Sequence, residues 1–96
     1  MADFILFMHA DCDQIDASAI EPYLEKLRRA GAFAGGSEIG EGACFKKLGA
    51  PGPLAAHIGG FIRIQAENLA AAKALLEGNP TYEAGGTVEI RSLPAT

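Results

Sequence analysis

The sequence predicts a single α+β domain of the ferredoxin-like class, with the element order βαββαβ. Four segments of continuous or alternating apolar residues indicate strands, at residues 4–8, 33–38, 57–65 and 87–93. Two segments with apolar residues at helical spacing indicate helices, over about 20–30 and 69–76. With right-handed crossovers, this order gives a four-stranded antiparallel sheet in the order 4-1-3-2, with two helices on one face. Residues 1–96 have room for one core and are expected to form one domain.

The first strand and the first helix have the clearest boundaries in the amino-terminal half. Every residue from Phe4 to Met8 is apolar, which indicates a central strand covered on both faces. The helix that follows tolerates Pro22 in its first turn, and Gly31 stands where a left-handed C-terminal cap is expected. Its inward residues are Ile20, Tyr23, Leu24, Leu27 and Ala30.

The middle of the chain is rich in glycine and proline. The segment from Phe33 to Glu38 is interrupted by two glycines and reads as a weak edge strand. Residues 43–47 either extend that strand or form a short hairpin arm. Residues 49–53 must form a loop, because their two prolines prevent regular strand pairing.

The second half alternates more regularly. In the segment 57–65, Ile58, Ile62 and Ile64 share one face, and Asn68 is a suitable N-cap for the helix that follows. Gly78 and Pro80 are expected to end this helix. Val88 and Ile90 then face the helices from the last strand. The sheet face away from the helices, called the open face, is predicted to carry Phe61, Arg63, Gln65, Glu89 and Arg91.

Composition argues against several classes of protein. Eight basic and twelve acidic residues give a net charge of −4, without the basic patch of a nucleic-acid binder. The apolar run at 4–8 is too short to span a membrane and lacks the features of a secretion signal. Two cysteines without CxxC spacing indicate a cytoplasmic protein with neither a disulfide framework nor a zinc site. The glycine pairs lack GxGxxG spacing, so no cofactor is expected.

Several short motifs in the last 40 or so residues resemble the YCII-related, DGPF-type domain family. These motifs are Gly59-Gly60-Phe61, Asn68-Leu69-Ala70-Ala71-Ala72, Gly78-Asn79-Pro80 and Gly86-Thr87-Val88-Glu89-Ile90-Arg91. The first half is similar in layout. The resemblance implies a dimeric α/β barrel, in which a homodimer forms through the open sheet faces. Two departures weigh against an inherited acid–base role: residues 50–54 stand where many relatives carry Asp-Gly-Pro-Phe, and Asn79 stands where others have Asp.

One end of the predicted sheet gathers the residues that could carry chemistry. Neighbouring antiparallel strands place His9, at the end of the first strand, beside His57, at the start of the third. The start of the first helix and the turn from Asn79 to Tyr82 reach the same end. If residues 9–13 stay extended, His9, Asp11 and Asp13 point the same way, and Asp11 would fix the tautomer of a general-base imidazole.

The candidate catalytic residues are therefore His9, Asp11 and His57, and the candidate ligand-binding residues are Arg63, Asp13 and Tyr82. All of these residues except Tyr82 have a structural alternative. Asp11 and Asp13 are common turn formers, and the histidines can be hydrogen-bonded residues at strand ends. Arg63 can bind a substrate carboxylate, but pairing with Glu89 or with an acid of a partner chain is favoured.

Two functions follow from these expectations. In the first, the protein is an enzyme or binder of a small polar acid, with a His/Asp site at the end of the first strand. In the second, it is a non-catalytic homodimerisation or interaction module whose histidines are structural. A concave apolar site where His9 and Asp11 converge would favour the first function, and a filled sheet end the second.

Overall fold

The computed structural model describes residues 1–95 and contains one antiparallel sheet. Its strands are β1 (Ala2–His9), β2 (Phe33–Glu38), β3 (Ile58–Ala66) and β4 (Val88–Leu93). They lie in the order β2-β3-β1-β4, which is the predicted 4-1-3-2 order read from the other edge. The ferredoxin-like α+β prediction is confirmed. β2 is an edge strand, as expected, and pairs with β3 alone within the described residues.

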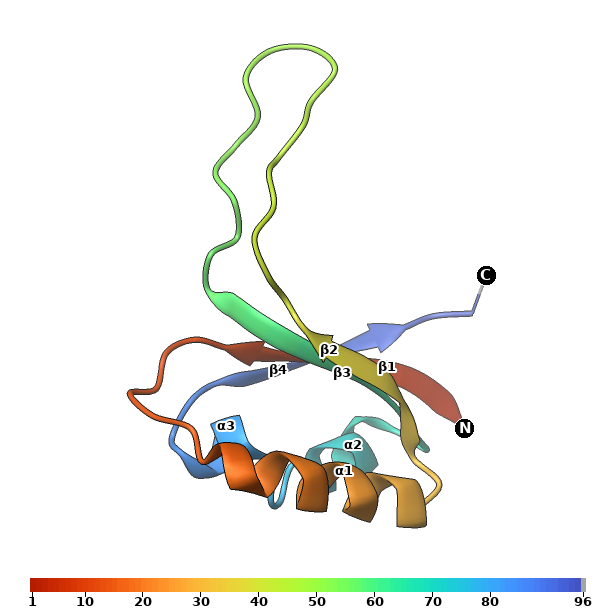
Figure 1. Cartoon of the computed structure of the whole chain (residues 1–96). Coiled ribbons are helices and arrows are strands. Elements are labelled where there is room, and N and C mark those ends of the chain that lie inside the picture. Colours follow the sequence, from red (N-terminus) through yellow and green to blue (C-terminus); the bar gives the residue numbers. More distant parts are fainter. Residues whose placement is uncertain (96) are drawn as a thin grey trace.

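The helices cover one face of this sheet (Figure 1). A 3-10 turn, η1 (Ala17–Ala19), leads into α1 (Ile20–Arg29), and Gly31 follows with the left-handed φ of 68° that a C-terminal cap requires. The second predicted helix is shorter than expected. α2 (Leu69–Ala74) begins at its N-cap Asn68, and a third helix, α3 (Pro80–Glu83), occupies the expected 79–82 turn.

The third helix forms because two local signals favour a new helix start. The side-chain oxygen of Asn79 accepts hydrogen bonds from the backbone N–H groups of Thr81 and Tyr82, at 3.0 and 3.1 Å. Pro80 occupies the first turn, where its missing N–H costs nothing. Pro80 therefore starts a helix here, in addition to following the end of α2.

The core lies between the sheet and the helices. It combines Phe4, Leu6, Ile62, Ile64 and Ala66 of the sheet with Tyr23, Leu27, Ala72 and Leu76 of the helical layer. The hydroxyl of Tyr23 donates to the Leu75 carbonyl oxygen at 2.7 Å, so this buried phenol joins α1 to the end of α2. Burial raises the pKa of Tyr23. Val88 and Ile90 pack against the core, as their alternation predicts.

The open face is apolar at its centre. Phe7 of β1 lies between Phe61 of β3 and Glu89 of β4, and Ile5 lies between Arg63 and Arg91. The expectation that β1 is covered on both faces is wrong for the single chain, because Ile5 and Phe7 remain half-exposed while Phe4 and Leu6 are buried. One layer of helices covers one face only.

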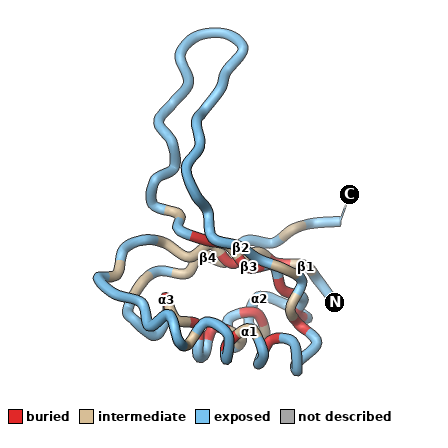
Figure 2. Tube along the Cα trace, in the orientation of Figure 1, coloured by how far each residue is buried: buried red, intermediate tan, exposed pale blue. Residues whose placement is uncertain are grey.

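Residues 39–57 form a long arm that rises from the sheet on the side opposite the helices (Figure 1). Its backbone has neither helix nor strand, and every residue in it is exposed (Figure 2). The strand extension considered for residues 43–47 is therefore absent. The glycines and the two prolines of the arm disfavour regular pairing between its legs.

Candidate functional site

The two histidines meet at one end of the sheet, as the strand order predicts. Their ring centroids are 5.0 Å apart and the rings are nearly perpendicular, at 78°. The backbone connects them, because the N–H of Ala10 donates to the His57 carbonyl oxygen at 2.7 Å. The His9 N–H donates to the Thr87 carbonyl oxygen at 2.9 Å, so His9 lies between β3 and β4.

The carboxylate partner of His9 is Glu89. His9 Nε2 lies 2.9 Å from Glu89 Oε1, and Arg91 donates to the second carboxylate oxygen at 3.1 Å. The hydrogen bond with His9, followed by that with Arg91, holds the pKa of Glu89 below its ordinary value. We call His9, His57, Glu89 and Arg91 the imidazole cluster. The expected Arg63–Glu89 pair is replaced by Arg91–Glu89 within β4.

Asp11 does not fix the His9 tautomer. Its carboxylate accepts hydrogen bonds from the Thr87 N–H at 2.8 Å and from the Thr87 hydroxyl at 2.6 Å. These two bonds, the hydroxyl bond first, hold the pKa of Asp11 below its ordinary value. Asp11 therefore ties the loop after β1 to the residue that precedes β4, which is a structural task.

The remaining candidate residues lie apart from this cluster. Asp13 is exposed in the loop between β1 and η1. Arg63 is exposed on the open face, with Ile5 between it and Arg91. Tyr82 is 46% exposed and lies beside α2 in a shallow depression that Lys73 and Glu77 also line.

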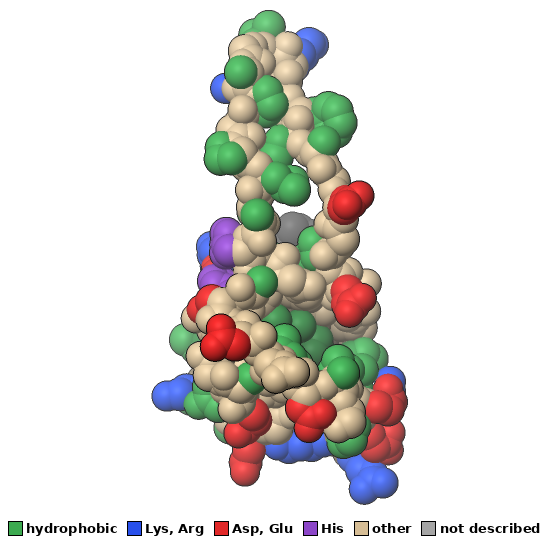
Figure 3. Space-filling model, turned by 60° about the vertical axis from the view of Figure 1, so that its left-hand side comes forward, with side chains coloured by type: hydrophobic (Ala, Val, Ile, Leu, Met, Phe, Trp, Pro, Cys, Tyr) green, Lys and Arg blue, Asp and Glu red, His purple; other side chains and the backbone are tan. Residues whose placement is uncertain are grey.

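A cavity of about 280 Å³ opens between the sheet and α1, at the same end of the molecule. Figure 3 shows hydrophobic side chains within the hollow below the base of the arm. The wall is mostly apolar and comes from both layers: its large apolar side chains are Met8, Ile15, Ile20, Leu24, Phe33 and Ile62. Ser37, Glu38 and Thr81 add polar groups.

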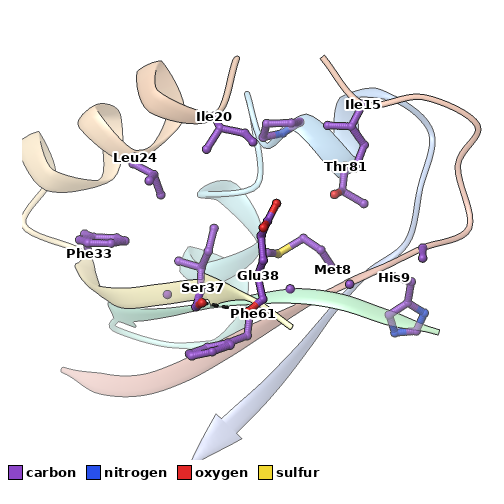
Figure 4. Close-up of a pocket in the computed structure, with 16 residues that line it drawn as sticks. Met8, His9, Ile15, Ile20, Leu24, Phe33, Ser37, Glu38, Phe61 and Thr81 are labelled. Atoms are coloured by element: carbon purple, nitrogen blue, oxygen red, sulfur yellow. Dashed lines mark hydrogen bonds between the residues drawn. The ribbon is translucent and has the colours of Figure 1, made fainter. Parts of the chain in front are cut away.

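His9 is among the residues that line the cavity, but its ring lies with the rest of the imidazole cluster on the opposite face of the sheet. Consecutive strand residues point to opposite faces, so Met8 enters the cavity while the His9 ring turns away (Figure 4). The Phe61 ring also points away from the cavity (Figure 4). The structure thus places a concave apolar site at the expected end of the sheet, but neither imidazole ring enters it.

Sequence reasoning missed this cavity because its wall depends on the spacing between two layers. The available signal was the pair Ile20 and Leu24, one helical turn apart and followed by Phe33 on the edge strand. Ile20 is 43% exposed, Ile15 is 41% exposed, and both lie in the cavity wall; a group of exposed apolar side chains indicates a site, whereas a single one does not.

The described part of the chain, residues 1–95, has no group of three His, Cys, Asp or Glu side chains arranged to hold a metal ion. Nor does it contain a helix with the length and apolar character needed to cross a membrane. Cys12 is half-buried and Cys44 is exposed on the arm, and both are free thiols.

Comparisons with known proteins agree with this architecture. No curated protein matches the chain. Among solved structures, 5-chloro-2-hydroxyhydroquinone dehydrochlorinase from Burkholderia phenoliruptrix, in complex with 2,5-dihydroxybenzoquinone, superposes with a TM-score of 0.54. The match covers 98% of this chain and 95% of that one at 16% sequence identity, which is a likeness of fold. The YCII-related domain profile matches residues 9–94, and the chain belongs to the YCII-related domain family.

Proposed function

We propose that this protein binds a small, mostly apolar organic molecule in the cavity between α1 and the sheet. The observation that carries this proposal is the cavity itself, with about 280 Å³ of space and six large apolar side chains in its wall. Pockets for small ligands start at roughly 300 Å³ and are lined mainly by apolar groups with a few polar ones. Protein interiors are otherwise close-packed, so a space of this size beside the core is a binding-site candidate.

The wall favours a neutral ring compound over the small polar acid expected from the sequence. Glu38 is the charged side chain that projects into the cavity (Figure 4), and its carboxylate would repel an anion. Thr81 offers a hydroxyl group to a polar substituent, whereas the Ser37 hydroxyl donates to the Glu38 carbonyl oxygen at 2.9 Å. The structural neighbour binds a single-ring compound, so phenols and hydroquinones are suitable first probes.

Ligand binding can be tested by NMR titration with neutral phenols and hydroquinones, beside matched benzoates. Quinones are avoided because they would react with the exposed Cys44 thiol. We expect shifts centred on Met8, Phe33 and Ile62 for the neutral rings, and weaker shifts for the benzoates. Ile20→Trp should fill the mouth of the cavity and remove these shifts.

Leu69→Trp is the matched control. Leu69 is 59% exposed on α2 and is not part of the cavity wall, so this variant should bind as the wild type does. Equal loss in both variants, or shifts centred on His57, would contradict the proposed location. Larger shifts with benzoates than with neutral rings would contradict a neutral ligand and favour a small polar acid instead.

A second candidate function, homodimerisation through the open face, is favoured by a different observation. Ile5, Phe7 and Phe61 form a half-buried apolar centre, with Arg63 and Arg91 at its side. Aromatic and arginine side chains are enriched at protein interfaces. A second open face would cover β1 on the side that the helices leave exposed.

Sedimentation equilibrium tests the dimer directly. We expect a dimer at micromolar concentration for the wild type and a monomer for Phe61→Glu, because the substitution would bury a charge in the apolar centre of the interface. Leu69→Glu, on the helical side, should leave the dimer intact. A wild-type species of 10.0 kDa throughout would contradict the dimer.

A further inference from the structure

The arm is the feature that the functions proposed so far do not use. It carries exposed apolar side chains along its length: Ile39 is 43% exposed, Leu54 49%, Leu48 79% and Phe45 92%. Isolated apolar residues are common on surfaces, but this set occurs within one protruding segment. Figure 3 shows these hydrophobic side chains on both legs of the arm.

The shape of the chain indicates that the arm is not packed on its own body. The radius of gyration is 14.6 Å, whereas a compact domain of this length would have about 12.5 Å. The principal extents are 46, 37 and 19 Å, and the arm rises away from the helices and the sheet (Figure 1). Loops this long without secondary structure are uncommon in compact domains and are usually functional.

The direction of the arm favours a second copy of this chain as its partner. The arm rises on the open-face side of the sheet, which is where a second copy would lie in the proposed dimer (Figure 1). Packed sheets lie about 10 Å apart, and a helical layer follows roughly 10 Å beyond. Each leg of the arm has about nine residues and can span roughly 30 Å, so the arm passes the sheet of a second copy and reaches its helices.

Charge also favours a second copy. Lys46 and Lys47 lie near the tip of the arm, and the chain as a whole has a net charge of −4. Acidic residues are concentrated around the start of α1 of every copy, where Asp11, Asp13, Asp16 and Glu21 occur. A basic tip that reaches the start of α1 in a second copy meets charges of opposite sign, whereas the last turn of α1 carries Lys26, Arg28 and Arg29.

We propose that each arm packs along the second copy in the homodimer, with Phe45, Leu48 and Leu54 covered by the partner and the lysines directed toward the acidic residues around the start of its α1. This inference rests on the proposed open-face dimer. It assigns a role to the segment that separates β2 from β3.

Cys44 provides a native probe of this contact, because its thiol lies beside Phe45 and is exposed in the single chain. We expect its rate of alkylation to fall several-fold as the protein concentration rises through the dimer dissociation constant. In Phe61→Glu, which should stay monomeric, the rate should be fast at every concentration. Cys12→Ser serves as the background in all samples, so that Cys44 is the single reporter.

The second measurement is the dimer dissociation constant of a Phe45→Ser/Leu48→Ser variant. Both side chains are exposed in the monomer, so the fold should be retained, and the dissociation constant should rise at least about ten-fold, or about 1.4 kcal/mol. Glu67→Ser is the control: Glu67 is exposed in the turn between β3 and α2, outside the arm, the open face and the helices, and its substitution should leave the constant unchanged. An unchanged constant together with a concentration-independent Cys44 rate would overturn the arm contact while the open-face dimer stands.

The remaining outcomes separate the two proposals. A wild-type monomer at all concentrations would overturn both. A dimer that survives Phe61→Glu but dissociates in the arm variant would overturn the open-face interface, and with it the packing proposed for the arm. Faster Cys44 alkylation in the dimer than in the monomer would place the arm away from the partner and overturn the inference.

Discussion

Two carboxylates, those of Asp11 and Glu89, form different hydrogen bonds at the end of the sheet where His9 and His57 meet. The sequence suggests Asp11 as the partner of His9, because the two residues are near neighbours in an extended segment. In the structure Asp11 instead accepts two hydrogen bonds from Thr87, and Glu89 takes the place beside His9. Both carboxylates have lowered pKa values, since each is the acceptor of two hydrogen bonds.

Asp11 should contribute to the acid sensitivity of the fold. Its folded-state pKa lies below its value in the unfolded chain, so its stabilising effect is complete above about pH 4 and is lost as the pH falls through the folded-state pKa. Asp11→Asn should therefore reduce the loss of stability in acid, measured as urea midpoints at neutral pH and at pH values below the unfolded-state pKa. Asp13→Asn, in the same exposed loop, should leave this dependence unchanged. An equal effect of both substitutions would contradict a specific role for the Thr87 bonds.

His9→Ala separates a structural histidine from a ligand-binding one. The ring faces away from the cavity and bonds to Glu89, so the variant should melt at a lower temperature while the thermal shift caused by a neutral ring compound persists. Thermal shift measurements on both proteins provide the comparison. Loss of the ligand shift without loss of stability would instead restore the catalytic hypothesis for His9.

At the scale of elements, close backbone approach shapes the edge of the sheet. β2 pairs with β3 through a register shift between Phe33 and Gly36, and Gly36 lies against the β3 backbone. A Cβ at Gly36 would lie 2.6 Å from the Phe61 carbonyl oxygen, a distance that only a backbone shift can relieve. The glycines of β2 thus lower its intrinsic preference for strand structure, but Gly36 allows the close approach that its pairing with β3 requires.

Gly36→Ala should lower the free energy of unfolding by about 1–3 kcal/mol, because the added methyl group collides with backbone atoms. Gly40→Ala is the matched control. Gly40 has no heavy atom of the described residues within 4 Å of an added Cβ and lacks a left-handed φ, so its change should stay within about 0.5 kcal/mol. Urea unfolding measures both. Similar losses of unfolding free energy in the two variants would show that the β2 backbone shifts to accommodate the methyl group at little cost.

At the scale of the whole molecule, one face of the sheet is covered by helices and the other is uncovered in the single chain. Helices cover the first face, and the second presents Ile5, Phe7 and Phe61 to solvent in the single chain. The arm rises beside that second face. The proposed homodimer would cover this second face, and the cavity proposed to bind a ligand lies on the side of the helices.

This view predicts a melting temperature that depends on protein concentration. Unfolding of a dimer is coupled to dissociation, so the wild type should melt at a higher temperature over about a hundred-fold increase in concentration. Phe61→Glu should melt at one temperature throughout that range. Scanning calorimetry measures both, and a concentration-independent wild type would contradict a dimer whose stability is coupled to folding.

The sequence by itself determined the order and pairing of the elements. Alternation at 57–65, helical spacing at 20–30 and the Asn68 cap are local patterns, and right-handed crossovers then leave one sheet order. That order was enough to bring His9 beside His57, which are 48 positions apart, since 57 − 9 = 48. It also predicted which side chains of β3 and β4 face the helices.

Tertiary structure alone decided which carboxylate bonds to His9, where the cavity forms and in which direction the arm points. Glu89 reaches His9 because the register between β1 and β4 sets which side chains meet, and packing fixes that register rather than any local pattern. The cavity depends on how far α1 stands from the sheet, which no single segment encodes. The arm has no periodicity to interpret, so only its attachment to β2 and β3 determines that it rises over the open face.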